Sequence, residues 1–286
     1  MADTPKALDS LEEIAGAYKA VFCDVWGVLH NGVSVFGDAC AALARARARG
    51  LVVVLITNSP RVSAEVSAFL REIGVPGETW DALVTSGDVT RDLVSENARR
   101  IFHIGPDSDL GLYEGLDVEL VEEFEAAAVV CTGLYDDETE TPDDYTEMLL
   151  RLRSRNLPFI CANPDIVVER GERLIWCAGA LARDYAQLGG RTLIAGKPHP
   201  PIYRAALKAA AAVLGSEPAP GEVLAIGDGV LTDIKGAVAN GFDALFVTAG
   251  IHAAEYGDAQ NVDAERLADF LERHGQLPVA TMPRLA

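Results

Sequence analysis

Two short apolar runs, residues 19–29 (KAVFCDVWGVL) and residues 51–57 (LVVVLIT), decide the fold of this chain. A helical pattern follows each of them, over Asp38 to Gly50 and from Ser59 to about Gly74. A continuous apolar run is typical of a strand that is buried on both faces of a parallel sheet. The order strand, helix, strand, helix therefore predicts an α/β fold with helices on both faces of the sheet.

The same rhythm returns near the end of the chain. Residues 200–215 (PPIYRAALKAAAAVLG) and 232–241 (TDIKGAVANG) have helical patterns, and residues 222–227 (EVLAIG) and 243–247 (DALFV) read as strands. We therefore predict a doubly wound parallel-sheet core, Rossmann-like in type, built from residues 1–85 and 195–286. The final PVATMPRLA (278–286) is expected to be an irregular tail.

The middle stretch, residues 86–194, has strands and helices of its own. Expected strands are RIFHIG (100–105), AAVVCTG (127–133), LPFICAN (157–163) and ERLIWC (172–177), with helices around 142–156 and 179–188. This pattern predicts a separate α/β domain inserted into the core. The acidic YDDETETPDD (135–144) has no hydrophobic pattern and is expected to be a solvated loop that leads into a helix capped near Thr141.

Composition narrows the functions that the chain can have. A net charge of −19 argues against nucleic acids and anionic membranes as partners, because both are negatively charged. The apolar runs are far shorter than the roughly 20 residues of a membrane span, and the first residues do not have the order of a secretory signal. We therefore expect a soluble, cytoplasmic protein.

The five cysteines are scattered and include no C-x-x-C pair. Most of them lie in apolar runs, which favours reduced thiols in the core. A nucleophilic role for Cys23 is the less favoured alternative, because its run offers no cationic neighbour to lower the pKa of the thiol.

Polar residues gather where the predicted strands end or a helix begins. In doubly wound sheets, groups at the carboxyl ends of different strands lie close together although they are far apart in sequence. Each cluster alone could also be a turn or a helix cap. The clusters are Asp24, Thr57-Asn58-Ser59, Gly196-Lys197-Pro198 and Gly227-Asp228.

Asp24 stands among apolar neighbours, where an unpaired carboxylate is costly unless it is paired or bound to a metal. Asp228 and Asp233 add carboxylate oxygens of the kind that Mg²⁺ prefers. Ser59 reads as a helix N-cap and Pro60 as the first helical residue, which would place an anion site at a helix N-terminus beside Thr57.

Taken in order, these residues resemble the motifs of the haloacid dehalogenase superfamily. The similarity is to the class IIA branch of p-nitrophenyl-phosphatase-like and sugar- or nucleotide-phosphatase-like enzymes, and it spans nearly the whole chain. Residues 24–29 resemble the first motif, 57–58 the second, 196–198 the third, and 227–228 with 232–233 the fourth. The middle stretch resembles the inserted cap domain, with class IIA signatures in residues 162–165 (ANPD) and 178–180 (AGA).

The resemblance implies a phosphatase of small phosphate monoesters, such as a sugar phosphate, a nucleotide or a vitamin phosphate. Asp24 would be the nucleophile that takes the phosphoryl group, and Lys197 a second catalytic residue. Further roles implied by the family are Mg²⁺ binding by Asp24, the backbone carbonyl of Trp26, Asp228 and Asp233, and substrate binding by Thr57, Asn58, Lys197, Asn163 and Asp165. A homodimer formed through the cap also fits the family.

The chain departs from the family pattern at Trp26. Most of these phosphatases carry a second Asp at this position, which protonates the leaving oxygen, and an indole cannot exchange that proton. Because a positioned acid or base contributes roughly 10² to 10⁴ in rate, its loss should slow hydrolysis. His30, His199 or Asp165 could substitute for it.

Two alternatives follow from Trp26. The first is a metal-free dehalogenase, in which the aspartate attacks carbon. Asp228 and Asp233 argue against it, because without a cation these carboxylates would only repel Asp24. The second is a protein that binds a phosphorylated metabolite and turns it over negligibly, although a pure binding site gains little from a nucleophile.

Overall fold

The computed structural model describes residues 5–171, 173–257 and 261–286. Its contacts group the chain into two compact units. The first unit contains the residues up to Thr57, Ser67–Val84 and Tyr203–Ala286, and the second contains Asn58–Val66 and Thr85–Ile202. These units are defined by packing and mix segments from different parts of the chain. The domain boundaries expected from the sequence (1–85, 86–194 and 195–286) therefore stay a prediction.

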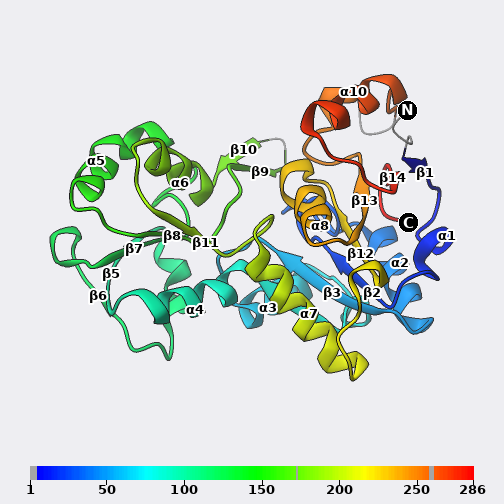
Figure 1. Ribbon diagram of the computed structural model, residues 1–286, viewed down its shortest axis with the longest axis horizontal. Helices are drawn as coiled ribbons and strands as arrows, with labels where there is room; N and C mark the ends of the chain where they lie inside the picture. Colours follow the sequence, from blue (N-terminus) through cyan, green and yellow to red (C-terminus); the bar gives the residue numbers. More distant parts are fainter. Residues whose placement is uncertain (1–4, 172, 258–260) are drawn as a thin grey trace. The chain divides into compact units, whose positions relative to one another are not determined.

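The first unit is built on a parallel sheet that uses strands from both ends of the chain, blue and yellow to red in Figure 1. In the described residues the strand order is β1-β14-β13-β12-β2-β3-β4. The order reverses between β2 and β12, which makes this neighbouring pair the topological switch point of the sheet. The strands are β1 (Lys6–Ala7), β2 (Ala20–Cys23), β3 (Val52–Thr57), β4 (Ala82–Thr85), β12 (Val223–Gly227), β13 (Asp243–Val247) and β14 (Ala280–Met282).

Helices connect these parallel strands, as the sequence pattern predicts, and the predicted doubly wound α/β class is confirmed. The longest are α2 (Gly37–Ala48), α3 (Ser63–Glu72), α7 (Pro200–Leu214) and α10 (Ala264–His274). Shorter ones are α1 (Glu12–Ala15), η1 (Gly77–Thr79), η5 (Pro220–Glu222), the π-helical turn η6 (Val230–Ile234), α8 (Lys235–Ala239) and α9 (Ala253–Tyr256).

Strands β2, β3 and β12 are buried along their whole length, which explains why their sequences are continuously apolar. The five cysteines, which all lie in the described part of the chain, are buried free thiols, as expected. Burial raises the pKa of Cys161 to about 12, so this thiol stays protonated at neutral pH.

The second unit has its own parallel sheet and a separate antiparallel hairpin. Among its described residues the sheet order is β11-β8-β7-β5-β6. Alternate residues of β7 enter two different hydrophobic clusters, Val129 and Cys131 in one and Ala128 and Val130 in the other. Both faces of this sheet are therefore covered, as in the first unit.

The strands of this unit are β5 (Arg100–Ile104), β6 (Glu119–Leu120), β7 (Ala128–Cys131), β8 (Phe159–Cys161) and β11 (Thr192–Ile194), with the hairpin β9 (Val167–Arg170) and β10 (Arg173–Trp176). Its helices are α4 (Ser86–Asn97), η2 (Asp107–Tyr113), η3 (Glu123–Glu125), η4 (Pro142–Tyr145), α5 (Thr146–Ser154) and α6 (Ala178–Gln187). Of the strand expected at 172–177, residue 172 lies outside the described residues.

The end of the chain differs from its prediction. Residues 278–286 were expected to be an irregular tail, but β14 (Ala280–Met282) is an inner strand of the first sheet, between β13 and β1. Its three residues are too few to show a strand pattern, and β1 is distant in sequence. Pairing on both sides by parallel neighbours creates this strand, and a local pattern could not reveal it.

The start of α3 is also different. The sequence placed Ser59 at the N-cap and Pro60 inside the helix, whereas α3 begins at Ser63. The amide of Gly87 donates to the carbonyl of Ser59 at 3.0 Å, which holds the preceding segment against the N-terminus of α4. The carboxylate of Asp88 accepts the N–H of Ser63 at 3.1 and 3.2 Å, so this side chain faces the beginning of α3. The predicted start of the helix at Ser59 and Pro60 is therefore wrong, and anion binding beside Thr57 stays a prediction.

No helix within the described ranges combines the length and the apolar character that a transmembrane segment requires.

The position of β14 predicts a stability effect that an irregular tail would not give. Met282 is 1% exposed, and we expect Met282→Ala to lower the free energy of unfolding by about 2–5 kcal/mol through lost burial and a residual cavity. Leu277→Ala, at a position that is 56% exposed, is the matched control and should change it by less than about 0.5 kcal/mol. Urea unfolding followed by circular dichroism measures both. Equal, small effects would contradict the assignment of β14 to the core.

Candidate active site

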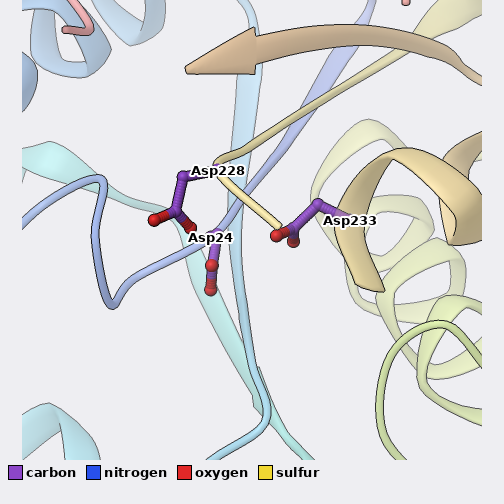
Figure 2. Close-up of side chains that lie close together, drawn as sticks. All are labelled: Asp24, Asp228 and Asp233. Atoms are coloured by element: carbon purple, nitrogen blue, oxygen red, sulfur yellow. The ribbon is translucent and has the colours of Figure 1, made fainter. Parts of the chain in front are cut away.

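Three carboxylates meet at the carboxyl ends of β2 and β12 (Figure 2). Asp24 directly follows β2, Asp228 directly follows β12, and Asp233 belongs to the turn η6. One oxygen of each lies within 4.8 Å of the others, and the residues are only 7%, 7% and 4% exposed. The structure therefore brings together the three acidic side chains that the sequence predicted as metal ligands.

The register of the two strands explains this convergence. Cys23 of β2 lies beside Ile226 of β12, and the amide of Asp24 donates to the carbonyl of Ile226 at 2.8 Å. Because the strands are parallel and end within one residue of the same level, the residues that follow them leave the sheet side by side. The switch point thus brings two acids together.

Main-chain N–H groups orient each carboxylate. One oxygen of each accepts a hydrogen bond from a backbone amide, which fixes the direction in which that oxygen points. The donors are Val25 to Asp24 at 2.7 Å, Ile251 to Asp228 at 3.0 Å, and Gly229 to Asp233 at 3.0 Å. The orientation of the three carboxylates is therefore set by hydrogen bonds from the main chain.

Glycines allow the backbone to approach Asp228 closely. A Cβ atom on Gly27 or Gly250 would lie only 2.2 or 2.1 Å from Oδ2 of this carboxylate. Gly27 also has a φ of +83°, a backbone conformation that residues other than glycine rarely adopt. Gly250 and Ile251 were not identified from the sequence, although a glycine shortly after the strand 243–247 was a signal for them.

The three carboxylates fit a divalent cation. Like charges this close and this buried repel one another strongly unless a cation lies between them. Carboxylate oxygens are the ligands that hard cations such as Mg²⁺ prefer. The chemistry of the site therefore agrees with the predicted cofactor.

Two other predicted residues, Thr57 and Trp26, belong to the first unit. Thr57 ends β3, the neighbour of β2 in the sheet, and is 6% exposed. Trp26 follows Asp24 by two residues, and its ring packs edge-to-face on His30 at 4.9 Å between centroids. Metal binding by the carbonyl of Trp26 and phosphate binding by Thr57 stay predictions.

His30 is a poor substitute for the missing acid. It is 2% exposed, and burial lowers its pKa to about 4. Its Nδ1 accepts a hydrogen bond from the amide of Gly32 at 2.9 Å, which is a bond to the neutral ring. At neutral pH the imidazole is therefore uncharged. Its ring packs against the indole of Trp26, which is a structural role.

The remaining predicted residues form a second group, inside the second unit. Asn58 and Lys197 are 3% and 2% exposed. The side-chain amide of Asn58 makes two hydrogen bonds to the backbone of Lys197, in which Nδ2 donates to the carbonyl and Oδ1 accepts from the N–H. Asn58 also donates to Asp165 at 2.8 Å, and Asn163 accepts the amide of Asp165 at 3.1 Å. The structure thus joins Asn58, Asn163, Asp165 and Lys197 in one hydrogen-bonded cluster.

Comparisons with known proteins identify the family. A profile described as haloacid dehalogenase-like hydrolase matches residues 21–119, and a second HAD-hydrolase-like profile matches residues 194–273. A crystal structure of a haloacid dehalogenase-like hydrolase from Brucella suis 1330 is 58% identical, with a TM-score of 0.89, and the match covers 98% of this chain and 100% of that one. The chain belongs to the haloacid dehalogenase-like hydrolases, and the resemblance noted in the sequence is confirmed.

Two more distant relatives have named activities. The 5'-nucleotidase YutF of Bacillus subtilis is 25% identical over 244 residues, which are 84% of this chain and 90% of the relative. Glycerol phosphate phosphatase Rv1692 of Mycobacterium tuberculosis, crystallised in complex with magnesium, is 26% identical with a TM-score of 0.64. That match covers 83% of this chain and 70% of the relative.

The close approach of Gly250 to Asp228 predicts a loss of metal affinity on substitution. In Gly250→Ala the new methyl group must displace the carboxylate, and we expect divalent-cation affinity to fall about 10- to 100-fold. Electron paramagnetic resonance of free Mn²⁺ measures the affinity for this ion, and competition with Mg²⁺ then gives the affinity for Mg²⁺. Gly16→Ala is the control, because no atom lies within 4 Å of its Cβ position. Unchanged affinity in Gly250→Ala would show that Asp228 does not hold the cation.

Proposed function

We propose that this protein is a Mg²⁺-dependent hydrolase of small phosphate monoesters that works through an aspartyl-phosphate on Asp24. The observation that carries the proposal is the buried cluster of Asp24, Asp228 and Asp233 at the switch point of the sheet. The names of the two distant relatives, a 5'-nucleotidase and a glycerol phosphate phosphatase, agree with a phosphate ester as substrate.

The three carboxylates, with the backbone carbonyl of Trp26, would hold the Mg²⁺ ion. The Mycobacterium tuberculosis relative that was crystallised with magnesium supports this choice of ion. When bound, the ion supplies positive charge that neutralises the acids and the transferring phosphoryl group.

Asp24 acts as the nucleophile in this proposal. Its carboxylate oxygen attacks phosphorus in line, the bond from phosphorus to the ester oxygen breaks, and the leaving alkoxide takes a proton from solvent water. Water then attacks the same phosphorus and gives up a proton to solvent, the bond from phosphorus to the Asp24 oxygen breaks, and phosphate and the free carboxylate are released. The hydrogen bond from the amide of Val25 holds Asp24 in one orientation for both steps.

Thr57, Asn58 and Lys197 are proposed to form the part of the site that holds the phosphoryl group, with Lys197 as the positive charge. In the second unit, Asn163 and Asp165 are proposed to contribute to substrate recognition. The leaving group is then a sugar, a nucleoside or a similar small alcohol. A cytoplasmic location and a homodimer remain the expectations drawn from the sequence.

Trp26 favours one alternative function, which is binding of a phosphorylated metabolite with negligible turnover. An indole two residues after the nucleophile cannot protonate a leaving oxygen, and the buried, neutral His30 does not replace it. A stoichiometric, metal-dependent burst of phosphoryl transfer to Asp24 without steady turnover would identify this alternative.

Metal removal and Asp24→Asn test the proposal directly. Phosphate release from p-nitrophenyl phosphate and from a panel of sugar phosphates and nucleotides should require Mg²⁺ and stop when a chelator is added. Asp24→Asn should lose about 10³-fold or more of kcat, because the amide is not a nucleophile. Circular dichroism checks that the variant is folded. Release that persists in the chelator, or in Asp24→Asn, would contradict the mechanism.

Trp26→Asp tests whether general acid catalysis is missing. The new carboxyl group restores a proton donor next to the nucleophile, so we expect kcat for poor leaving groups to rise by up to about 10². Trp26→Asn is the matched control, since it removes the indole and supplies an amide of the same size without an acidic proton. Equal rates for the two variants would mean that another group already donates the proton.

A further inference from the structure

Three loops of the second unit meet with almost no space between them. They are residues 58–61, residues 163–165 and residues 195–198. A Cβ atom on Gly196 would lie 2.6 Å from Oδ1 of Asn58 and 2.8 Å from the ring of Pro164. Glycine is therefore required at this position, and the path of the chain into Lys197 depends on Asn58 and Pro164.

Asn58 is the centre of this contact. Its Oδ1 accepts the amide N–H of Lys197 at 2.7 Å, and its Nδ2 donates to the carbonyl of Lys197 at 3.3 Å. Nδ2 also donates to Oδ1 of Asp165 at 2.8 Å. Since an amide has two N–H donors, both are engaged by protein oxygens, and the side chain holds the backbone of Lys197 on two sides.

Asp165 fixes which way the amide of Asn58 points. A carboxylate accepts hydrogen bonds only, so it selects the orientation in which Nδ2 faces it and Oδ1 faces the N–H of Lys197. Asp165 is itself held by its backbone, because its amide donates to Asn163 at 3.1 Å and its carbonyl accepts from Gly179 at 3.1 Å. Gly179 is in contact with this loop, since its Cβ position is 2.2 Å from the carbonyl of Pro164.

We infer that Asp165 is a positioning residue, which acts through Asn58 to fix the backbone of Lys197. The inference rests on the proposed function for its catalytic consequence, because Lys197 is proposed there as the charge that meets the phosphoryl group. It changes the roles of three predicted substrate-binding residues. Asn163 holds Asp165, Asp165 orients Asn58, and Asn58 holds Lys197, which fixes the backbone from which the ammonium group extends.

A competing role for Asp165 is proton transfer to the leaving group, in place of the acid that Trp26 lacks. The two roles differ in what the carboxyl group must supply. Positioning requires an acceptor oxygen, which asparagine retains, whereas proton transfer requires an ionisable group, which asparagine lacks. Asp165→Asn and Asp165→Ala therefore separate them.

Hydrogen exchange at the amide of Lys197 tests the positioning without reference to activity. The chain has five lysines, at positions 6, 19, 197, 208 and 235, so selective ¹⁵N-lysine labelling gives a simple amide spectrum, and Lys197→Arg identifies the signal. In Asp165→Ala we expect this amide to exchange about tenfold faster or more, while the other lysine amides are unchanged. In Asp165→Asn the increase should stay below about threefold.

Asp117→Ala is the control, because Asp117 is in the same unit and its side chain is 80% exposed in a surface ion pair with Arg99. It should leave the exchange of Lys197 unaltered. If the Lys197 amide exchanges as slowly in Asp165→Ala as in the original protein, the inference is overturned.

Steady-state kinetics then distinguish positioning from proton transfer. For positioning, Asp165→Ala should lower kcat about 10- to 100-fold and Asp165→Asn only about threefold, with the same shape of the pH profile in both. Equal losses in the two variants, with one limb of the pH profile removed, would overturn positioning in favour of proton transfer. Absence of metal-dependent phosphate release in the original protein would instead reject the proposed function, and the exchange experiment would still decide the role of Asp165.

Discussion

The parallel pairing of β2 with β12 is the constraint on which the catalytic geometry of the first unit depends. It sets Cys23 level with Ile226, so that Asp24 and Asp228, which follow the ends of the two strands, leave the sheet within one residue of the same level. Two buried carboxylates at that distance oppose folding by their repulsion, and a third, Asp233, adds to it. A bound cation would offset this repulsion, which is why we propose a metal site at this point of the sheet.

Backbone amides and glycines make this arrangement rigid. Each carboxylate accepts an N–H from the main chain, and Gly27 and Gly250 let two segments press against Asp228. Side-chain donors would add rotatable bonds, whereas backbone donors are fixed by the same hydrogen bonds that form the sheet and its loops. Orientation within a few tenths of an ångström is what a nucleophile attacking in line requires.

Most of the core and the identity of the acids could be predicted from the sequence, because their signals are local. Buried parallel strands are continuously apolar, and Asp24 and Asp228 directly follow such runs. The parts that the sequence did not predict depend on contacts between distant residues. Strand β14 exists because β13 and β1 pair with it, and α3 starts at Ser63 because Gly87 and Asp88 bind the segment before it.

The hydrogen bonds of Asn58 also depend on contacts between distant residues, which the sequence alone does not predict. The family resemblance implies that Asn58, Asn163 and Asp165 bind the substrate, and this stays a prediction. In the structure Asn58 is hydrogen-bonded to Asp165 and to the backbone of Lys197, and Asn163 accepts the backbone amide of Asp165. A buried amide must satisfy its donors and acceptors, and both N–H donors of Asn58 have oxygen partners in this cluster. Its contact with the backbone of Lys197, which no local sequence pattern reveals, is what makes Asn58 a candidate to hold that lysine in place.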